Sequence, residues 1–244
     1  MSESPGAIKI LMRQLNLNNV GAPDFVLKED ESMSRLGYLE FILNEEQRMR
    51  TEKKYQRRLR QGNIPPLVYN SKVSGINVEQ LNRILTLGFT ESRGNLIIIG
   101  QCRTGKTALA STLAENFISH NQAVYYIKIY DLIEILVNRN TSPAAERKYE
   151  YMLSSGMIII DEFLYTGITD TDLALLFRFI SMVNDLSSIV IITNRYFDEW
   201  LDATEDEFLM QTLIERLIGD CEVFRTQPLK NDLLPTRTPK RKKK

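Results

Sequence analysis

The chain has 244 residues, of which 43% are hydrophobic and 25% charged, and its 31 basic and 31 acidic residues cancel. This composition is that of a globular protein large enough to bury a full core. No apolar run approaches the roughly 18–20 residues of a membrane span, and the first residues lack a signal-peptide pattern. We therefore expect a cytoplasmic protein with no membrane partner. Its two distant cysteines predict neither a metal site nor a disulfide framework.

The first part of the chain predicts helices. Residues 6–17 carry apolar side chains at helical spacing. After a break rich in Asn, Gly and Pro, Ser32 or Ser34 is placed to cap a long helix that extends to about Arg60 and stops before a Pro-Pro pair. The first half of this helix is apolar and the second half is basic. We therefore predict a helical N-terminal region, residues 1–66, that binds DNA or a partner.

Positive charge is concentrated in two segments. Residues 47–60 hold seven basic residues and one acid, and residues 237–244 hold six basic residues and no acid. Clustered Arg and Lys favour a phosphate backbone, so we predict that the long helix binds double-stranded DNA. The alternative is a solvated helix face. Residues 231–244 are predicted to be a disordered basic tail. The candidate DNA contacts are Arg48, Arg50, Lys53, Lys54, Arg57, Arg58 and Arg60.

From Asn95 onward, apolar strands alternate with helices, which predicts a parallel sheet with helices on both faces. A short helix near Val78–Leu87 precedes it, with Gly88 as its C-terminal cap. The predicted strands are 96–99, 123–127, 157–160, 188–193 and 222–224. The predicted helices are 107–118, one from Asp131, 173–186 with Asp170 or Thr171 as its cap, 197–201 and 207–218.

The first strand leads into the sequence GQCRTGKT at 100–107, which fits the phosphate-binding pattern G-x-x-x-x-G-K-[ST]. The two glycines let the backbone approach phosphate oxygens, and the loop N–H groups face the anion. Lys106 can reach the β and γ phosphates, and the Thr107 hydroxyl can ligate Mg²⁺. The strand–loop–helix context favours nucleotide binding over a chance match. The predicted ATP-binding residues are Gly100, Gln101, Cys102, Arg103, Thr104, Gly105, Lys106, Thr107 and Ala108.

A later strand, MIIIDEF at 157–163, ends in two carboxylates. A buried parallel strand delivers its last residues to the ligand-binding edge of the sheet. Asp161 is placed to hold Mg²⁺ opposite Thr107, and Glu162 to polarise the water that attacks the γ-phosphate. Alone, these carboxylates would be better explained as an acidic strand end or a helix cap. Their combination with the phosphate loop favours the catalytic role.

Two more residues are candidates for the same reaction. Asn194 follows another buried strand and could bridge the attacking water and the γ-phosphate, although a turn asparagine is an ordinary alternative. Arg216 lies in an apolar helix and could reach the nucleotide of a neighbouring subunit. The alternative for Arg216 is a surface arginine paired with Glu215 or Glu222.

The motifs GQCRTGKT, MIIIDEF, IVIITNRYFDEW and LIERLI resemble, in that order, those of AAA+ ATPases of the IstB/DnaC type, most closely the IstB-like transposition helper ATPases. The resemblance covers about residues 8–230. It implies a five-stranded αβα sandwich, strand order 5-1-4-3-2, in a domain at 67–230, with ATP and Mg²⁺ as cofactors. It also implies self-assembly with ATP sites between subunits. The implied roles are Walker A for Lys106 and Thr107, Walker B for Asp161 and Glu162, sensor 1 for Asn194 and arginine finger for Arg216.

The function that the resemblance implies is an ATPase that assembles on target DNA and recruits or stimulates an insertion-sequence transposase. The alternatives are a loader of a replicative helicase, as DnaC is, and a P-loop ATPase without a nucleic-acid partner. Two positions depart from the family. Arg103 stands where many members have glycine, and Thr226–Lys230 replaces a Gly-x-Ser-Tyr-Arg-like segment. Lys230 as a substitute for that arginine would lack the planar guanidinium.

Overall fold

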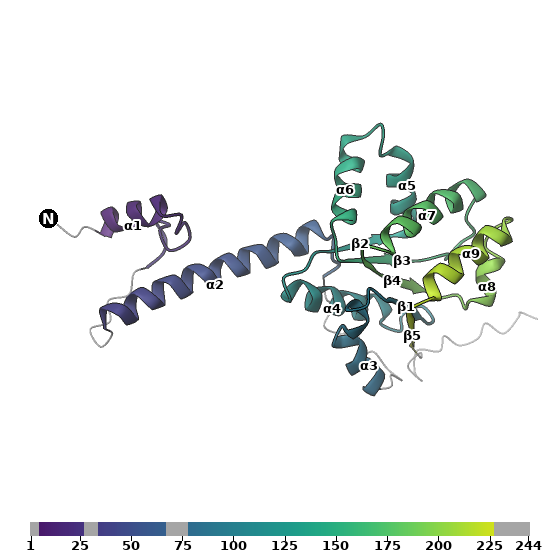
Figure 1. The fold of residues 1–244 in the computed structure, drawn as a ribbon, viewed down its shortest axis with the longest axis horizontal. Coiled ribbons are helices and arrows are strands. Elements are labelled where there is room, and N and C mark those ends of the chain that lie inside the picture. Colours follow the sequence, from purple (N-terminus) through teal and green to yellow (C-terminus); the bar gives the residue numbers. More distant parts are fainter. Residues whose placement is uncertain (1–4, 27–33, 67–77, 227–244) are drawn as a thin grey trace, which may run out of the picture. The chain divides into compact units, whose positions relative to one another are not determined.

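The computed structural model describes residues 5–26, 34–66 and 78–226. The chain divides into two compact units, residues 1–58 and 59–244, which are considered separately (Figure 1). The predicted domain limits stay predictions. The predicted tail, 231–244, and Lys230 lie outside the described residues.

The first unit is helical, as predicted. It contains α1, Pro5–Gln14, and most of α2, Arg35–Gln61. Ser34 caps α2, since its hydroxyl accepts a hydrogen bond from Gly37 N at 3.1 Å. The buried carboxylate of Glu46 joins α2 to the segment that follows α1. It accepts hydrogen bonds from Asn19 N at 2.8 Å, Val20 N at 2.9 Å and Arg50 Nε at 2.7 Å.

The second unit is built on one parallel sheet. Its strand order is β2-β3-β4-β1-β5, which confirms the predicted order 5-1-4-3-2. Residues of β1, β3 and β4 are buried at every position, as expected for strands covered on both faces. Because all pairs are parallel, the carboxyl ends of the strands meet at one edge. The strands are β1 (Asn95–Ile99), β2 (Val124–Lys128), β3 (Met157–Asp161), β4 (Ser188–Thr193) and β5 (Cys221–Arg225).

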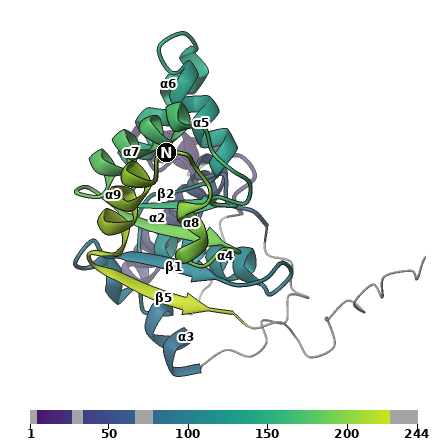
Figure 2. The same ribbon diagram turned by 90° about the vertical axis from the view of Figure 1, so that its right-hand side faces the viewer.

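Helices cover both faces of this sheet, with α5, α7 and α9 on one face and α4 on the other (Figure 2). None of the helices in the described ranges is both long and apolar enough to cross a membrane. The helices of this unit are α3 (Val78–Leu85), the 3-10 helix η1 (Gly88–Thr90), α4 (Lys106–Ser119), α5 (Ile129–Asn138), α6 (Pro143–Leu153), α7 (Asp170–Val183), α8 (Asp198–Leu201) and α9 (Glu207–Ile218).

Two predicted caps are wrong. The left-handed residue after α3 is Leu87, with φ 62°, and Gly88 instead begins η1. The cap of α7 is Thr169, not Asp170 or Thr171, because Thr169 is extended and its hydroxyl accepts from Asp172 N.

Helix α6 is not predicted by the sequence pattern. Its charged residues obscure the apolar spacing, although its start carries a recognisable signal. Ser142 accepts a hydrogen bond from Ala145 N, and Pro143 occupies the first turn.

Candidate nucleotide-binding site

The predicted phosphate loop connects β1 to α4, and its shape depends on glycine at two positions. Gly105 has φ 85°, a conformation that L side chains rarely adopt. A Cβ on Gly100 would lie 1.9 Å from the Thr226 hydroxyl oxygen and 2.9 Å from its carbonyl oxygen. Arg103 is also left-handed, with φ 66°. This conformation explains why glycine suits the position, and why an exposed arginine there carries backbone strain.

The end of β5 is attached to the loop. Thr226 N donates to Ile99 O at 2.9 Å, and Thr226 Oγ1 lies 2.5 Å from Thr104 Oγ1. Thr104 Oγ1 also lies 2.9 Å from Gln101 O, to which it donates. Both threonines are buried. Spacing could not have revealed this contact, because the two threonines lie 122 positions apart in sequence.

Lys106 is the first residue of α4 and lies over the loop. Its ammonium donates to Gly100 O and Gln101 O, both at 2.7 Å. Burial lowers the pKa of this ammonium, and Cys102 and Asp161 act against that shift. Phosphate oxygens are stronger acceptors than these carbonyls, so a bound nucleotide would compete well for the ammonium. Among the other predicted ATP-binding residues, those exposed are Gln101, Cys102, Arg103 and Thr107, and Ala108 is partly buried.

Thr107 and Asp161 meet, as the sequence predicts. Thr107 Oγ1 donates to Asp161 Oδ2 at 3.0 Å. The Tyr126 hydroxyl donates to the same oxygen, and Glu162 N donates to Asp161 Oδ1 at 2.7 Å. Burial and Asp161 both raise the pKa of Tyr126, so its phenol stays a donor. One hydroxyl and one carboxylate beside a phosphate loop form a donor set that fits Mg²⁺, which prefers oxygen ligands and keeps waters.

Glu162 follows Asp161 in an unusual backbone conformation. Its φ is 56°, and its Oε1 accepts from Lys128 Nζ at 2.7 Å. Both side chains are substantially exposed, 41% for Glu162 and 50% for Lys128. The hydrogen bond to Glu162, together with the charges of nearby carboxylates, raises the pKa of Lys128. Tyr126 and Lys128 are not predicted from the sequence, since only the register of β2 against β3 places them here.

Asn194 directly follows β4, the strand between β3 and β1. Its Oδ1 is buried and has no hydrogen-bond partner within the described ranges. Buried polar atoms are rarely left unsatisfied, so an orphan acceptor at this edge suits a group that meets water or ligand.

Arg216 is exposed near the end of α9 and is not part of this cluster in its own chain. Its guanidinium donates to Ser181 O at 3.4 Å and lies 5.8 Å from the centre of the Phe177 ring. The proposed surface pairings are not seen in the described part of the chain. Glu222 pairs with Arg83 at 2.9 Å, and Glu215 accepts from Gln211.

Several predicted DNA contacts are engaged within the first unit. Arg48 pairs with Glu45 at 3.0 Å, and Lys53 donates to Asn19 Oδ1 at 2.5 Å. Arg50 holds the buried Glu46 and also donates to Asn16 O. The remaining candidates differ in exposure: Arg57 and Arg60 are exposed, Lys54 and Arg58 are partly buried, and the Arg58 Nη1 is buried without a partner among described residues.

Comparisons with known proteins agree with this geometry. The model of the family described as IstB-like ATP binding protein matches residues 13–234. A protein of Bacteroides fragilis named as an IS21-like insertion-sequence ATP-binding protein is 25% identical over 87% of this chain and 84% of its own length.

Solved structures share the fold. A replication initiator DnaA bound to AMPPCP and single-stranded DNA matches with TM-score 0.53 and 14% identity, over 68% of this chain and 51% of that one. The DnaC helicase loader matches with TM-score 0.51 and 16% identity, over 65% of this chain and 97% of that one. The chain therefore has the AAA+ P-loop fold, and it belongs to the IstB-like ATP binding protein family.

Proposed function

We propose that this ATP-binding family member is a Mg²⁺-dependent ATPase that assembles on double-stranded DNA and recruits or stimulates an insertion-sequence transposase. The observation that carries the proposal is the meeting of Lys106, Thr107 and Asp161 at one sheet edge, with Glu162 and Asn194 at the ends of neighbouring strands. The insertion-sequence relatives support the transposase as partner.

The loop and the start of α4 would bind the nucleotide. Loop N–H groups and the α4 N-terminus favour the phosphate anion, and Lys106 would exchange its two carbonyl partners for phosphate oxygens. Thr107 and Asp161 would hold Mg²⁺, which neutralises charge on the β and γ phosphates. Tyr126 orients Asp161 from β2, so that one carboxylate oxygen is fixed by a donor that does not titrate near neutral pH.

Hydrolysis requires a water to attack the γ-phosphorus while the bond to the ADP oxygen breaks. Glu162 would accept the proton of that water, and Asn194 would orient the water against the phosphate. Glu162 now pairs with Lys128, so it must leave or share this partner to act as base. Arg216 faces solvent from α9, which suits a residue that stabilises charge on a neighbouring subunit's nucleotide.

DNA would contact the basic half of α2. Arg57 and Arg60 are exposed, whereas Arg50 and Lys53 hold the first unit together. We therefore assign Arg57 and Arg60 to phosphate contacts, and give Arg50 and Lys53 a structural role instead.

The test is binding of the full chain to duplex DNA with and without Mg²⁺-ATP, at several salt concentrations. Affinity should rise with ATP and fall with salt, and Arg57→Ala with Arg60→Ala should flatten the salt dependence. Affinity that responds to neither would contradict assembly on DNA. Pull-down of a replicative helicase, rather than of the transposase of the same element, would favour the helicase-loader alternative, which the fold alone does not distinguish.

A further inference from the structure

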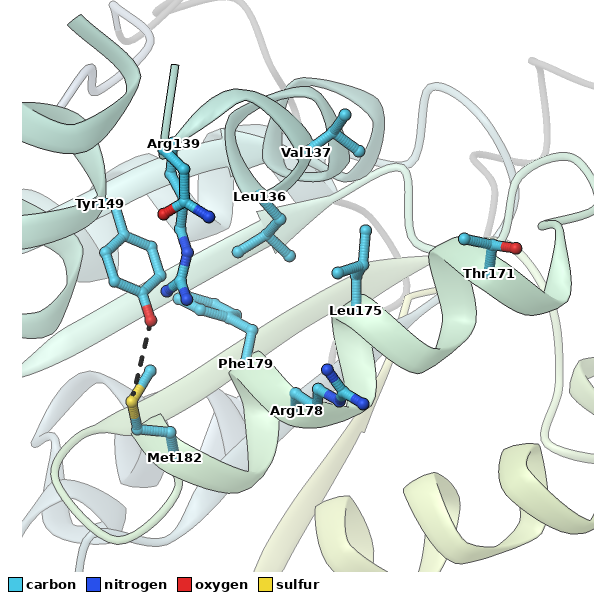
Figure 3. Close-up of a pocket in the computed structure, with 10 residues that line it drawn as sticks. Leu136, Val137, Arg139, Tyr149, Thr171, Leu175, Arg178, Phe179 and Met182 are labelled. Atoms are coloured by element: carbon cyan, nitrogen blue, oxygen red, sulfur yellow. Dashed lines mark hydrogen bonds between the residues drawn. The ribbon is translucent and has the colours of Figure 1, made fainter. Parts of the chain in front are cut away.

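Helices α5, α6 and α7 enclose a pocket of about 570 Å³ that shares no residue with the nucleotide site. Figure 3 shows side chains from all three helices converging on it. Its walls are apolar and aromatic, and the Tyr149 hydroxyl lies 3.8 Å from Met182 Sδ. Met182 and Val137 are exposed by 39% and 56%. The apolar lining residues are Leu136, Val137, Tyr149, Leu175, Phe179 and Met182.

Two arginines also line this pocket. The Arg139 guanidinium lies 4.6 Å from the centre of the Tyr149 ring, and Arg178 is exposed on α7. Neither guanidinium forms an ion pair in the part of the chain that the structure describes. An apolar pocket with two uncompensated cations favours a ligand that joins a large apolar group to carboxylates.

The same chain carries such a group at the start of α9. Phe208 is 81% exposed, the largest fraction among the exposed large hydrophobic side chains of the described residues. Glu205 and Glu207 flank it closely, both exposed, and neither forms an ion pair within the described ranges. Asp206 caps the helix by accepting from Leu209 N at 2.9 Å. A capped helix presents Phe208 with little conformational entropy left to lose on binding.

Phe208 does not fill the pocket of its own chain. The segment before it is tied to the start of α7, since the Thr204 hydroxyl and Asp206 N both donate to Asp170 Oδ1, at 2.8 and 3.1 Å. With this anchor in place Phe208 remains in solvent. The occupant that fits is therefore the same segment of a different molecule.

We propose that Phe208 of one copy, with Glu205 and Glu207, docks into the α5–α6–α7 pocket of a second copy, where the carboxylates meet Arg139 and Arg178. The two surfaces lie on different helices, so the contact is heterologous: each copy offers one surface to each of two neighbours. The contact involves no residue of the nucleotide site. Disproof of this contact would therefore leave the proposed ATPase activity untouched, and disproof of the ATPase activity would leave this contact untouched.

The first test is sedimentation velocity of the full chain over a range of concentrations, without nucleotide or DNA. The wild type should self-associate, and Phe208→Ala should weaken association by about tenfold or more. Ile218→Ala is the matched control, since Ile218 is 45% exposed at the other end of the same helix, and it should behave as wild type. A wild type that stays monomeric at every concentration, or an unchanged Phe208→Ala variant, would overturn the proposal.

A charge exchange gives the second test and guards against misfolded variants. The variant with Arg139→Glu and Arg178→Glu should lose association, as should the variant with Glu205→Arg and Glu207→Arg. Mixed in equal amounts, the two should associate again, because each reversed surface meets a partner of opposite charge. No recovery in the mixture would overturn the pairing. In the sedimentation test Lys106→Ala should associate as the wild type does, which separates this contact from the nucleotide site.

Discussion

Glu46 in the first unit and Glu162 in the second are both glutamates paired with a cation, yet their surroundings differ. Glu46 has a side chain only 3% exposed, lies within a regular helix and accepts bonds from Asn19, Val20 and Arg50. Glu162 is 41% exposed, has a left-handed backbone, and has only Lys128 as a hydrogen-bond partner of its carboxylate within the described ranges. A structural carboxylate is saturated with donors, whereas the candidate catalytic one keeps capacity for a water.

The same contrast holds for their neighbours. At Glu46, the backbone N–H groups of Asn19 and Val20 and the side-chain amide of Asn19 link α2 to the segment after α1. In the nucleotide site, which includes Glu162, Asn194 Oδ1 is buried without a partner among the described residues, and the loop residue Arg103 has a left-handed backbone. Unsatisfied atoms and strained backbones are costs that a folded chain retains mostly at functional sites. The following substitutions test whether this division into structural and functional groups is right.

Lys106→Ala should have the largest effect on function. Removing the ammonium deletes charge-assisted bonds to the phosphates, so ATP affinity should fall at least about 100-fold. Titration calorimetry with ATP measures this, and the unfolding midpoint should change little. Lys148→Ala, an exposed lysine on α6, is the control. Unchanged ATP affinity in Lys106→Ala would remove the loop from the proposed role.

Glu162→Gln should have the second-largest effect on function. The amide keeps the shape but cannot take the proton of the attacking water, so hydrolysis should slow by about 10²–10⁴-fold with ATP affinity preserved. Single-turnover assays of phosphate release measure the rate, with the exposed Glu134→Gln as control. A variant that hydrolyses ATP at the wild-type rate would exclude Glu162 as the base.

Glu46→Ala should act on stability and not on catalysis. It removes the acceptor of Arg50 Nε and of the backbone N–H groups of Asn19 and Val20, so the first unit should lose about 3 kcal/mol. Hydrogen exchange of residues 5–26 should rise, while ATP hydrolysis per bound nucleotide stays the same. Glu45→Ala, which breaks the partly exposed pair with Arg48, should cost no more than about 1 kcal/mol. Equal losses in the two variants would contradict the structural role of Glu46.

The pH dependence of this unit provides a related check. Burial alone would raise the pKa of Glu46, but hydrogen bonds from Val20, Arg50 and Asn19 outweigh it and the pKa is lowered. The stabilisation is therefore present above the unfolded pKa, about 4.3, and is lost as the pH falls through the lower folded value. Glu46→Gln should remove this acid-side dependence, as measured by urea unfolding between about pH 3 and pH 6. A dependence that persists in Glu46→Gln would assign it to other carboxylates.

Tyr126→Phe should have a moderate effect. Losing the hydroxyl that orients Asp161 should raise the Mg²⁺ concentration needed for half-maximal hydrolysis about tenfold. Tyr125→Phe is the matched control, because Tyr125 points to the opposite side of β2. The centre of its ring lies 5.8 Å from the centre of the Tyr151 ring. An equal shift in both variants would indicate a general effect on β2.

Lys128→Met should have the smallest effect, and in the opposite direction. Releasing Glu162 from an exposed ion pair should raise the rate of hydrolysis by about two- to fivefold, since such pairs are worth up to about 1 kcal/mol. Steady-state kinetics would detect it. A large fall in rate would show instead that Lys128 takes part in the reaction.

The sequence predicted those parts of the site that follow from local patterns. Asp161, Glu162 and Asn194 each come after an apolar strand, and the loop pattern placed Lys106, so their meeting at one edge follows from parallel pairing alone. Tyr126 and Lys128 could not be found this way, because only the register of β2 against β3 brings them to the carboxylates.

The sequence pattern gave a wrong prediction for the cap of α3 and no prediction for the contact between Thr104 and Thr226. The sequence predicts Gly88 as the C-terminal cap of α3, because glycine readily adopts the left-handed conformation of such caps, but Leu87 adopts it instead. The contact between Thr104 and Thr226 depends on β5 lying beside β1, so no spacing in the sequence could indicate it.

That contact has a mechanical consequence. Thr226 is bonded to Ile99 and Thr104, and its hydroxyl occupies the space where a side chain on Gly100 would lie. The end of β5 therefore restrains the position of the phosphate loop. A displacement of the end of β5 would therefore also displace Gly100 and Thr104, the first and fifth residues of the phosphate loop.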